Sequence, residues 1–98
     1  MGFEWDAAKN AANMAKHGID FDDAVRIFDG PVLEKVDQRR NYGEERIATV
    51  GMANGLELFV VYTVPKGNRR IISARRANKY EREAYRRAQA GEGKAGQN

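Results

Sequence analysis

The chain has 98 residues, of which 42% are apolar and 32% charged, and its formal net charge is +3 at pH 7. This length predicts one domain with a single modest core. The absence of cysteine excludes disulfides, thiolate nucleophiles and cysteine-based zinc sites. No apolar run reaches membrane-spanning length and the N-terminus lacks an apolar signal core, so we expect a soluble, cytoplasmic protein with no membrane partner.

The N-terminal third of the sequence predicts a short strand followed by two helices. Residues 3–5 are a possible edge strand, and Asp6 is a typical N-cap for a helix over 7–17. Gly18 would end this helix, and Asp20 would cap the next one. The apolar residues of the second helix recur at helical spacing and form one stripe toward a core. They are Phe21, Ala24, Val25 and Phe28.

Three or four antiparallel strands are expected in the middle of the chain, at residues 32–36, 46–51, 56–64 and 69–76. Asn54-Gly55 is a strong hairpin signal, and the third strand should be central because both of its faces are apolar. Strand alternation in the fourth strand predicts two faces. One carries Arg69, Ile71, Ser73 and Arg75, and the other carries Arg70, Ile72, Ala74 and Arg76.

The C-terminal part predicts one more helix and a tail. Asn78 and Glu81 have the spacing of a capping box that opens a helix ending near Gln89. The small and polar residues 90–98 should be disordered, so residues 1–89 would form the single domain. The expected class is α+β, with an antiparallel meander and helices packed on one face of the sheet.

Positive charge is concentrated in the predicted fourth strand and last helix. Residues 66–87 hold nine Lys/Arg and two Glu. Such a density of guanidinium groups on regular structure is typical of a surface that binds phosphate. The alternative is a solvated charged surface without a ligand.

Four stretches of the sequence together resemble the BrnT family of bacterial toxins: FEWDAAKNAANMAKHGIDFDDAVRIFDGP, GEERIATVG, LELFVVYTV and RRIISARRANKYEREAY. The resemblance covers roughly residues 3–88. It implies a small ribonuclease with a RelE-like fold, which acts as the toxin of a type II toxin–antitoxin system and stops translation by cutting RNA. It also implies a BrnA-like antitoxin with a ribbon-helix-helix part, so that DNA is bound only through the toxin–antitoxin complex.

Metal-independent RNA cleavage by the 2′-OH needs a base, an acid and cations that stabilise the charge on the phosphoryl oxygens. Arg75 and Arg76 end the fourth strand beside a helix start, where free backbone N–H groups also favour anions. Because adjacent strand residues point to opposite faces, we favour Arg75 for the site. The alternative is that these arginines pair with an acidic helix residue or stay solvated.

Two further residues are candidates for proton transfer. His17 is the only histidine and could move a proton near neutral pH, or it could serve the C-terminus of its helix. Glu81 could act as a base, although the capping box accounts for it without chemistry. The catalytic candidates are therefore Arg75, His17 and Glu81. We see no Asp/Glu/His cluster with metal-ligand spacing and expect no metal and no cofactor.

Six other residues are candidates for RNA binding: Arg76, Arg82, Lys79, Lys9, Trp5 and Arg46. Trp5 could stack on a base, or it could pack in the core. Lys9 could neutralise a phosphate, or it could be an ordinary surface lysine. Tyr80 is expected to pack, although at the helix start it could reach a substrate. The competing function is a non-catalytic RNA- or protein-binding module that uses the same basic strand and helix.

Overall fold

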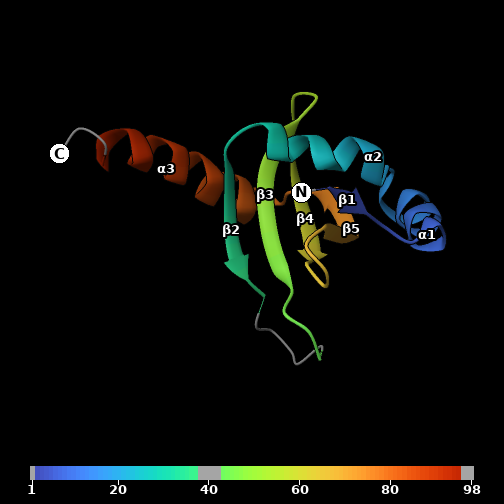
Figure 1. Cartoon of the computed structure of the whole chain (residues 1–98). Coiled ribbons are helices and arrows are strands. Elements are labelled where there is room, and N and C mark those ends of the chain that lie inside the picture. Colours follow the sequence, from blue (N-terminus) through green and yellow to red (C-terminus); the bar gives the residue numbers. More distant parts are fainter. Residues whose placement is uncertain (1, 38–42, 96–98) are drawn as a thin grey trace.

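The computed structural model describes residues 2–37 and 43–95, and their side chains as far as Gly91. Its centre is a five-stranded sheet in the order β1-β5-β4-β3-β2 (Figure 1). β2 to β5 form an antiparallel meander, and β1 pairs in parallel with β5. The strands are β1 Phe3–Glu4, β2 Val32–Val36, β3 Ile47–Ala53, β4 Leu56–Thr63 and β5 Arg69–Arg76. The predicted α+β class and the N-terminal edge strand are confirmed.

The helices begin and end largely where the sequence predicts. They are α1 Ala7–His17, α2 Phe21–Ala24, the 3-10 helix η1 Val25–Asp29, and α3 Lys79–Ala95. The Asp6 carboxylate accepts hydrogen bonds from the backbone N–H groups of Ala8 and Lys9, and that of Asp20 accepts one from Asp22. Gly18 ends α1 with a φ of 73°, which a side chain would disfavour. Both predicted N-caps are therefore confirmed.

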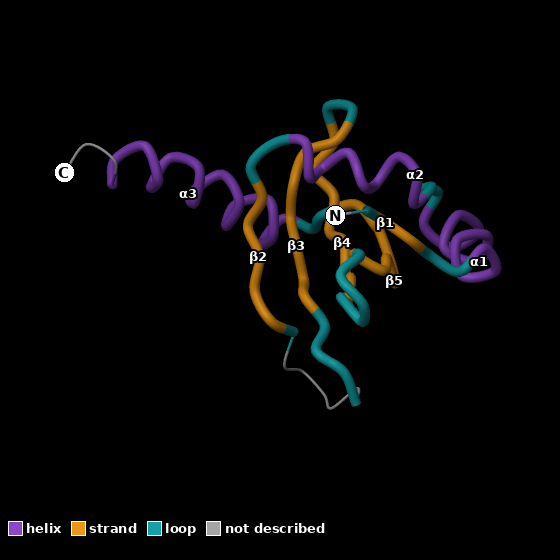
Figure 2. Tube along the Cα trace, in the orientation of Figure 1, coloured by secondary structure: helices purple, strands orange, loops and turns teal. Residues whose placement is uncertain are grey.

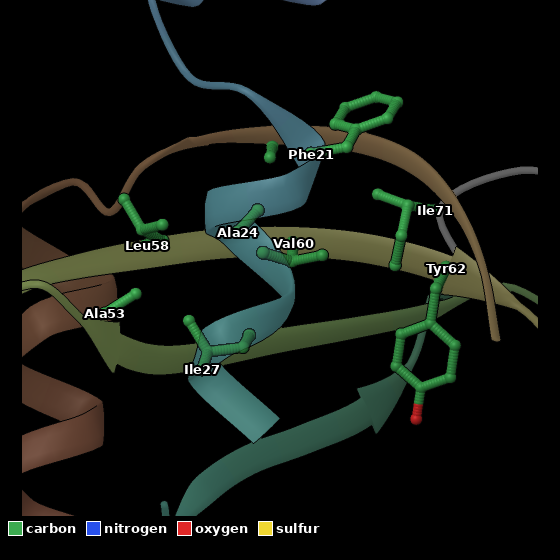
Figure 3. Packing of buried hydrophobic residues seen from close by; sticks show 9 residues of the cluster. Phe21, Ala24, Ile27, Ala53, Leu58, Val60, Tyr62 and Ile71 are labelled. Carbon is green, nitrogen blue, oxygen red and sulfur yellow. The ribbon is translucent and has the colours of Figure 1, made fainter. Parts of the chain in front are cut away.

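The second predicted helix changes its pitch after Ala24, and this changes its buried stripe. From Val25 onward the chain forms a 3-10 helix, in which every third residue returns to the same side. Phe21, Ala24 and Ile27 are each 0% exposed and pack against β4 (Figure 3). Val25 and Phe28, which we expected in the stripe, are only half-buried at its margin. The prediction from α-helical spacing missed Ile27 for this reason.

A β-bulge in β5 overturns the predicted alternation of its side chains. The pairing of β4 with β5 shifts between Val61 and Tyr62, which leaves Ile72 without a partner across the ladder. Ile71 and Ala74 consequently lie in the same core cluster, although they were predicted on opposite faces. Arg75 faces the other way, over the ring of Phe59.

The two faces of the sheet carry different helices. The first face packs against α2 and η1 and holds the larger core cluster. The second face meets the start of α3, where Tyr85 and Ala77 pack with Val50. The Tyr85 hydroxyl also donates a hydrogen bond to the carbonyl of Pro31 at 2.9 Å. Our expectation that all helices pack on one face is therefore wrong, because the chain crosses to the second face after β5.

The last helix is longer than the sequence predicts. α3 continues to Ala95 instead of ending near Gln89, and Figures 1 and 2 show it running away from the sheet beyond β2. Part of the tail that we expected to be disordered, residues 90–95, is therefore helical, whereas residues 96–98 lie outside the described part. None of the helices described is long and apolar enough to cross a membrane.

Asn13 of α1 closes the outer edge of β5 with its side chain. Its Nδ2 donates to the carbonyl of Ala74 at 2.8 Å, and its Oδ1 accepts from the N–H of Ala74 at 3.1 Å. The same Nδ2 donates to the carbonyl of Ile19 at 2.9 Å. The side-chain amide thus takes the place of a neighbouring strand at Ala74, because β1 is too short to extend that far.

We expect Asn13→Ala to lower the free energy of unfolding by about 2–4 kcal/mol, because it leaves the buried N–H and C=O of Ala74 without partners. Urea denaturation followed by circular dichroism measures this change. Lys16→Ala, on an exposed position of the same helix, is the matched control and should change stability by less than about 0.5 kcal/mol. Equal denaturation midpoints for the two variants would contradict this role of Asn13.

Candidate functional site

The junction of β5 and α3 is built by a reciprocal capping box. After Arg76 the chain passes through the buried Ala77 and reaches Asn78, which precedes the helix. The Asn78 Oδ1 accepts from the N–H of Glu81 at 2.8 Å, and the Glu81 Oε1 accepts from the N–H of Asn78 at 2.8 Å. The predicted capping box is therefore confirmed, and it fixes the Glu81 side chain over the end of β5.

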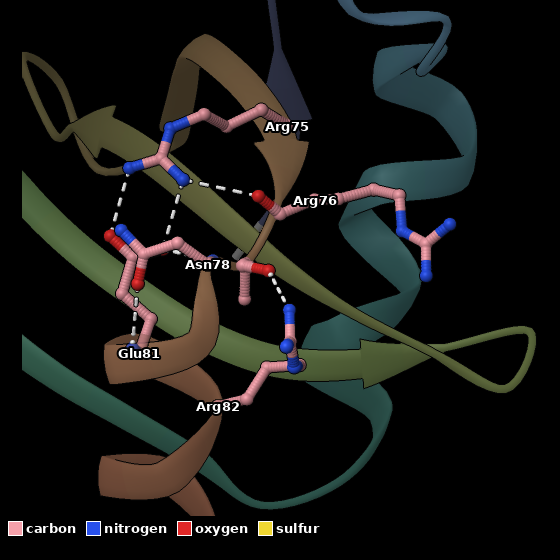
Figure 4. Close-up of polar contacts among 6 residues, drawn as sticks. Arg75, Arg76, Asn78, Glu81 and Arg82 are labelled. Atoms are coloured by element: carbon pink, nitrogen blue, oxygen red, sulfur yellow. Dashed lines mark hydrogen bonds and ion pairs between the residues drawn. The ribbon is translucent and has the colours of Figure 1, made fainter.

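Arg75 lies against this carboxylate in a two-point ion pair. Its Nη1 is 2.9 Å from Oε1 and its Nη2 is 2.8 Å from Oε2 of Glu81 (Figure 4). Nη1 also donates to the carbonyl of Arg76 at 3.1 Å, and the guanidinium lies 4.2 Å from the ring centroid of Phe59. The Arg75 side chain remains 32% exposed. Four contacts therefore hold the guanidinium plane in one orientation at the surface of the second face.

The remaining donors of Arg75 form an open edge. Both Nη1 hydrogens and one Nη2 hydrogen are used by Glu81 and by the Arg76 carbonyl. The Nε–H and the second Nη2–H point the same way from one side of the planar group. No acceptor among the described residues engages this edge. We call these two N–H groups the Arg75 fork, and they match two oxygens of a phosphate.

Three other cations surround the junction. The Nη1 of Arg82 donates to the carbonyl of Ala77 at 2.8 Å, which holds this side chain beside the capping box. Arg76 is exposed and points away from Arg75 (Figure 4), and Lys79 is exposed in the first turn of α3. Because Glu81 balances the charge of Arg75, the net positive charge here comes from Arg76, Lys79 and Arg82.

The basic segment does not form one continuous cationic edge. Besides Arg75, two of its arginines are paired with carboxylates: Arg70 with Glu4 at 2.8 Å and Arg86 with Glu57 at 2.7 Å. The hydrogen bond from Arg70 lowers the pKa of Glu4, and the hydrogen bond to Glu57 raises the pKa of Arg86. The positive charge available for a ligand is therefore smaller than the sequence suggests.

Arg69 serves the core of the first face. Its guanidinium lies 4.3 Å from the ring centroid of Phe28 and 5.4 Å from that of Tyr62. The Tyr62 hydroxyl donates to the Glu34 carboxylate at 2.5 Å. Burial and this hydrogen bond raise the pKa of Tyr62. Arg69 thus lies among aromatic rings, far along β5 from Arg75.

His17 is not brought into contact with Arg75 or Glu81. It lies half-buried in the last turn of α1, and its imidazole makes no hydrogen bond or ion pair within the described residues. α1 packs along the outer edge of β5 through Asn13, whereas Arg75 and Glu81 lie on the second face. A catalytic role for His17 stays a prediction.

The other predicted RNA-binding residues lie apart from the junction. Trp5 is half-buried, packs against the core cluster and meets the ring of Phe21 edge-to-face at 6.1 Å, and its role in RNA binding stays a prediction. Lys9 is exposed in the first turn of α1. Arg46 precedes β3 and lies 3.4 Å from Glu44. No described contact links any of these three to Arg75.

A groove on the second face begins next to Glu81. It has a volume of about 790 Å³ and runs between α3 and β2 over an apolar floor. The floor consists of Leu33, Ala48, Val50 and Phe59, and Tyr80, Glu81 and Ala84 form the wall on α3. The sequence did not predict this groove. It showed the apolar residues of the strands, but the groove forms only because α3 crosses to this face of the sheet. Within the described residues, no group of three or more His, Asp or Glu side chains is placed to hold a metal ion.

One comparison with known proteins identifies a family. The family model described as the ribonuclease toxin BrnT of type II toxin–antitoxin systems matches residues 5–81, which is well over half of the chain. No curated protein matches the sequence. The matched range includes α1, the whole meander and the capping box with Glu81.

We expect Glu81→Ala to lower the free energy of unfolding by about 1–2 kcal/mol, because the N–H of Asn78 and the half-buried Arg75 both lose their acceptor. Glu81→Gln keeps an acceptor for Asn78 and should cost about half as much. Thermal unfolding of both variants measures the difference. Glu83→Ala, in the same turn but exposed, is the control, and the role of Glu81 is refuted if all three variants unfold at the same temperature.

Proposed function

The chain belongs to the BrnT family of ribonuclease toxins of type II toxin–antitoxin systems, and from this premise we propose that it is a metal-independent endoribonuclease that inhibits translation. The observation that carries the proposal is the Arg75 fork. It offers two parallel donors at the surface, and their direction is set by Glu81 and the Arg76 carbonyl before any substrate arrives. Such preorganised donors are the main requirement for stabilising charge on a phosphoryl group.

The proposed reaction uses the nucleophile of the RNA itself. The 2′-oxygen forms a bond to the adjacent phosphorus, its proton passes to a base, and the bond from phosphorus to the 5′-oxygen breaks as that oxygen takes up a proton. Negative charge rises on the two phosphoryl oxygens during this step. The Arg75 fork donates one hydrogen bond to each of them, which lowers the energy of the transition state.

Glu81 fits a positioning role better than proton transfer. Its carboxylate accepts two hydrogen bonds from Arg75 and one from the Asn78 N–H, so these contacts engage about three of its four lone-pair sites and hold it against Arg75. A base needs a free lone pair directed at the substrate. We therefore assign Glu81 to the orientation of Arg75, and His17 remains the proposed proton-transfer group. Arg76, Lys79 and Arg82 would attract the RNA backbone toward the junction.

We also propose that a cognate antitoxin neutralises the protein in the cytoplasm, where its RNA substrate lies. A type II family implies an antitoxin partner, and the resemblance to BrnT toxins suggests a BrnA-like protein with a ribbon-helix-helix part. DNA would then be bound by the complex through the antitoxin. Co-expression of the chain with the product of its neighbouring gene, followed by isolation of the complex, tests this partner.

The competing function is a non-catalytic RNA- or protein-binding module. One observation favours it: Glu81 balances the charge of Arg75, which reduces the attraction of this arginine for an anion. This module would bind RNA in a salt-dependent manner without cutting it. The cleavage experiment below separates the two functions.

We expect Arg75→Ala to reduce RNA cleavage by about 100- to 1,000-fold, because the fork is lost from the transition state. Arg75→Lys keeps the charge without the planar fork and should also lose most of the activity. The measurement is cleavage of purified single-stranded RNA on a gel, with and without EDTA, which should not inhibit. Circular dichroism shows whether each variant is folded.

Arg87→Ala is the matched control, because it removes the same charge from an exposed position of α3 without touching the junction. It should cleave at nearly the rate of the unmodified protein. RNA that stays intact with folded unmodified protein supports the binding module, and inhibition by EDTA refutes the metal-independent reaction.

A further inference from the structure

We propose that the groove on the second face is a nucleobase subsite, in which the ring of Tyr80 stacks on a base of the RNA whose phosphate lies at the Arg75 fork. This inference rests on the proposed function, because it takes single-stranded RNA as the ligand. It adds a binding site, its chemical class of ligand and one residue that the reaction described above does not use.

Tyr80 is placed for stacking and not for packing. Tyr80 is 83% exposed, whereas the other exposed large apolar residues in the described part of the chain are between 36% and 45% exposed. It sits in the first turn of α3, at the rim of the groove. This turn is fixed by the capping box, so the ring is carried by a rigid backbone next to an apolar floor.

The groove and the fork are continuous. Phe59 belongs to the groove floor and also lies 4.2 Å beneath the Arg75 guanidinium. Glu81 lines the groove wall and binds Arg75 with both oxygens. An RNA strand with a phosphate at the fork would thus place a neighbouring base near the mouth of the groove.

The lining of the groove fits an uncharged base better than a phosphate. Besides its apolar floor, the groove is lined by Lys35 and by the acidic residues Glu34, Asp37 and Glu81, so a phosphate would be repelled there, whereas the fork binds it outside the groove. An exposed aromatic ring on which a base stacks is a feature by which proteins hold single-stranded nucleic acids without reading their sequence. The groove volume of about 790 Å³ also lies in the range of small-molecule sites.

The test is a fluorescence titration with a short oligoribonucleotide that carries 2-aminopurine and a 2′-deoxy residue at the cleavage position, so that binding is seen without cleavage. The full chain should quench the 2-aminopurine, because stacking quenches this base. Tyr80→Ala should lose the quenching and bind about 10-fold or more weakly, and Tyr80→Phe should retain both. An oligonucleotide with an abasic site at that position should bind Tyr80→Ala and the unmodified protein equally.

Met52→Ala is the control, because it removes another exposed apolar side chain from a distant hairpin. Ala84→Phe, which fills the groove from α3, should weaken binding as Tyr80→Ala does. The inference is overturned if Tyr80→Ala quenches and binds like the unmodified protein while Arg75→Ala still abolishes cleavage. Quenching without any cleavage of ordinary RNA would overturn the proposed ribonuclease and leave the subsite standing.

Discussion

The ion pair of Arg75 with Glu81 connects the last strand to the last helix, and the layout of the second face depends on it. Glu81 reaches back to β5 while it caps its own helix, so the direction of α3 is tied to the end of the sheet. That direction places Tyr85 on Val50 and leaves a groove between α3 and β2. The same contacts hold the Arg75 side chain in one rotamer, so that its N–H donors have a fixed direction. A pair of this kind, at the surface, adds little stability and much geometric definition.

Ion pairs with carboxylates also explain why the arginine-rich segment presents less positive charge than its composition suggests. Arg70, Arg75 and Arg86 each lie against a carboxylate from another part of the chain. None of these partners is close in sequence to Arg70 or Arg86, so charge counts along the chain could not reveal the pairing. For RNA binding this leaves a small set of free cations around one fixed fork. Affinity would then depend on contacts other than charge, which is where an aromatic ring at the groove becomes useful.

Local signals in the sequence predicted the elements well. The helix caps bond to backbone N–H groups only two or three residues away, so their roles follow from sequence spacing alone. This holds for Asp6, Asp20 and the Asn78–Glu81 capping box. The bulge at Ile72 and the 3-10 pitch of η1 do not follow from the periodic patterns, which therefore placed Ile71 and Ala74 on opposite faces and missed Ile27. The candidate site was predicted in part. Arg75 pairs with Glu81, which is one of the alternatives that the sequence left open, but the exposure of Tyr80 beside a groove depends on the crossing of α3 to the second face.

The amide of Asn13 has a consequence for association with other chains. A strand that ends a sheet normally offers a row of free backbone groups, to which a foreign strand can add. On the outer side of β5, the backbone groups pair first with β1 and then, at Ala74, with the Asn13 side chain. A strand from another protein therefore cannot form a continuous series of hydrogen bonds with β5. At the opposite end of the sheet, no described strand pairs with the outer side of β2. Because β1 has only 2 residues, the longer border at which a partner protein could extend the sheet is β2, the border over which α3 extends.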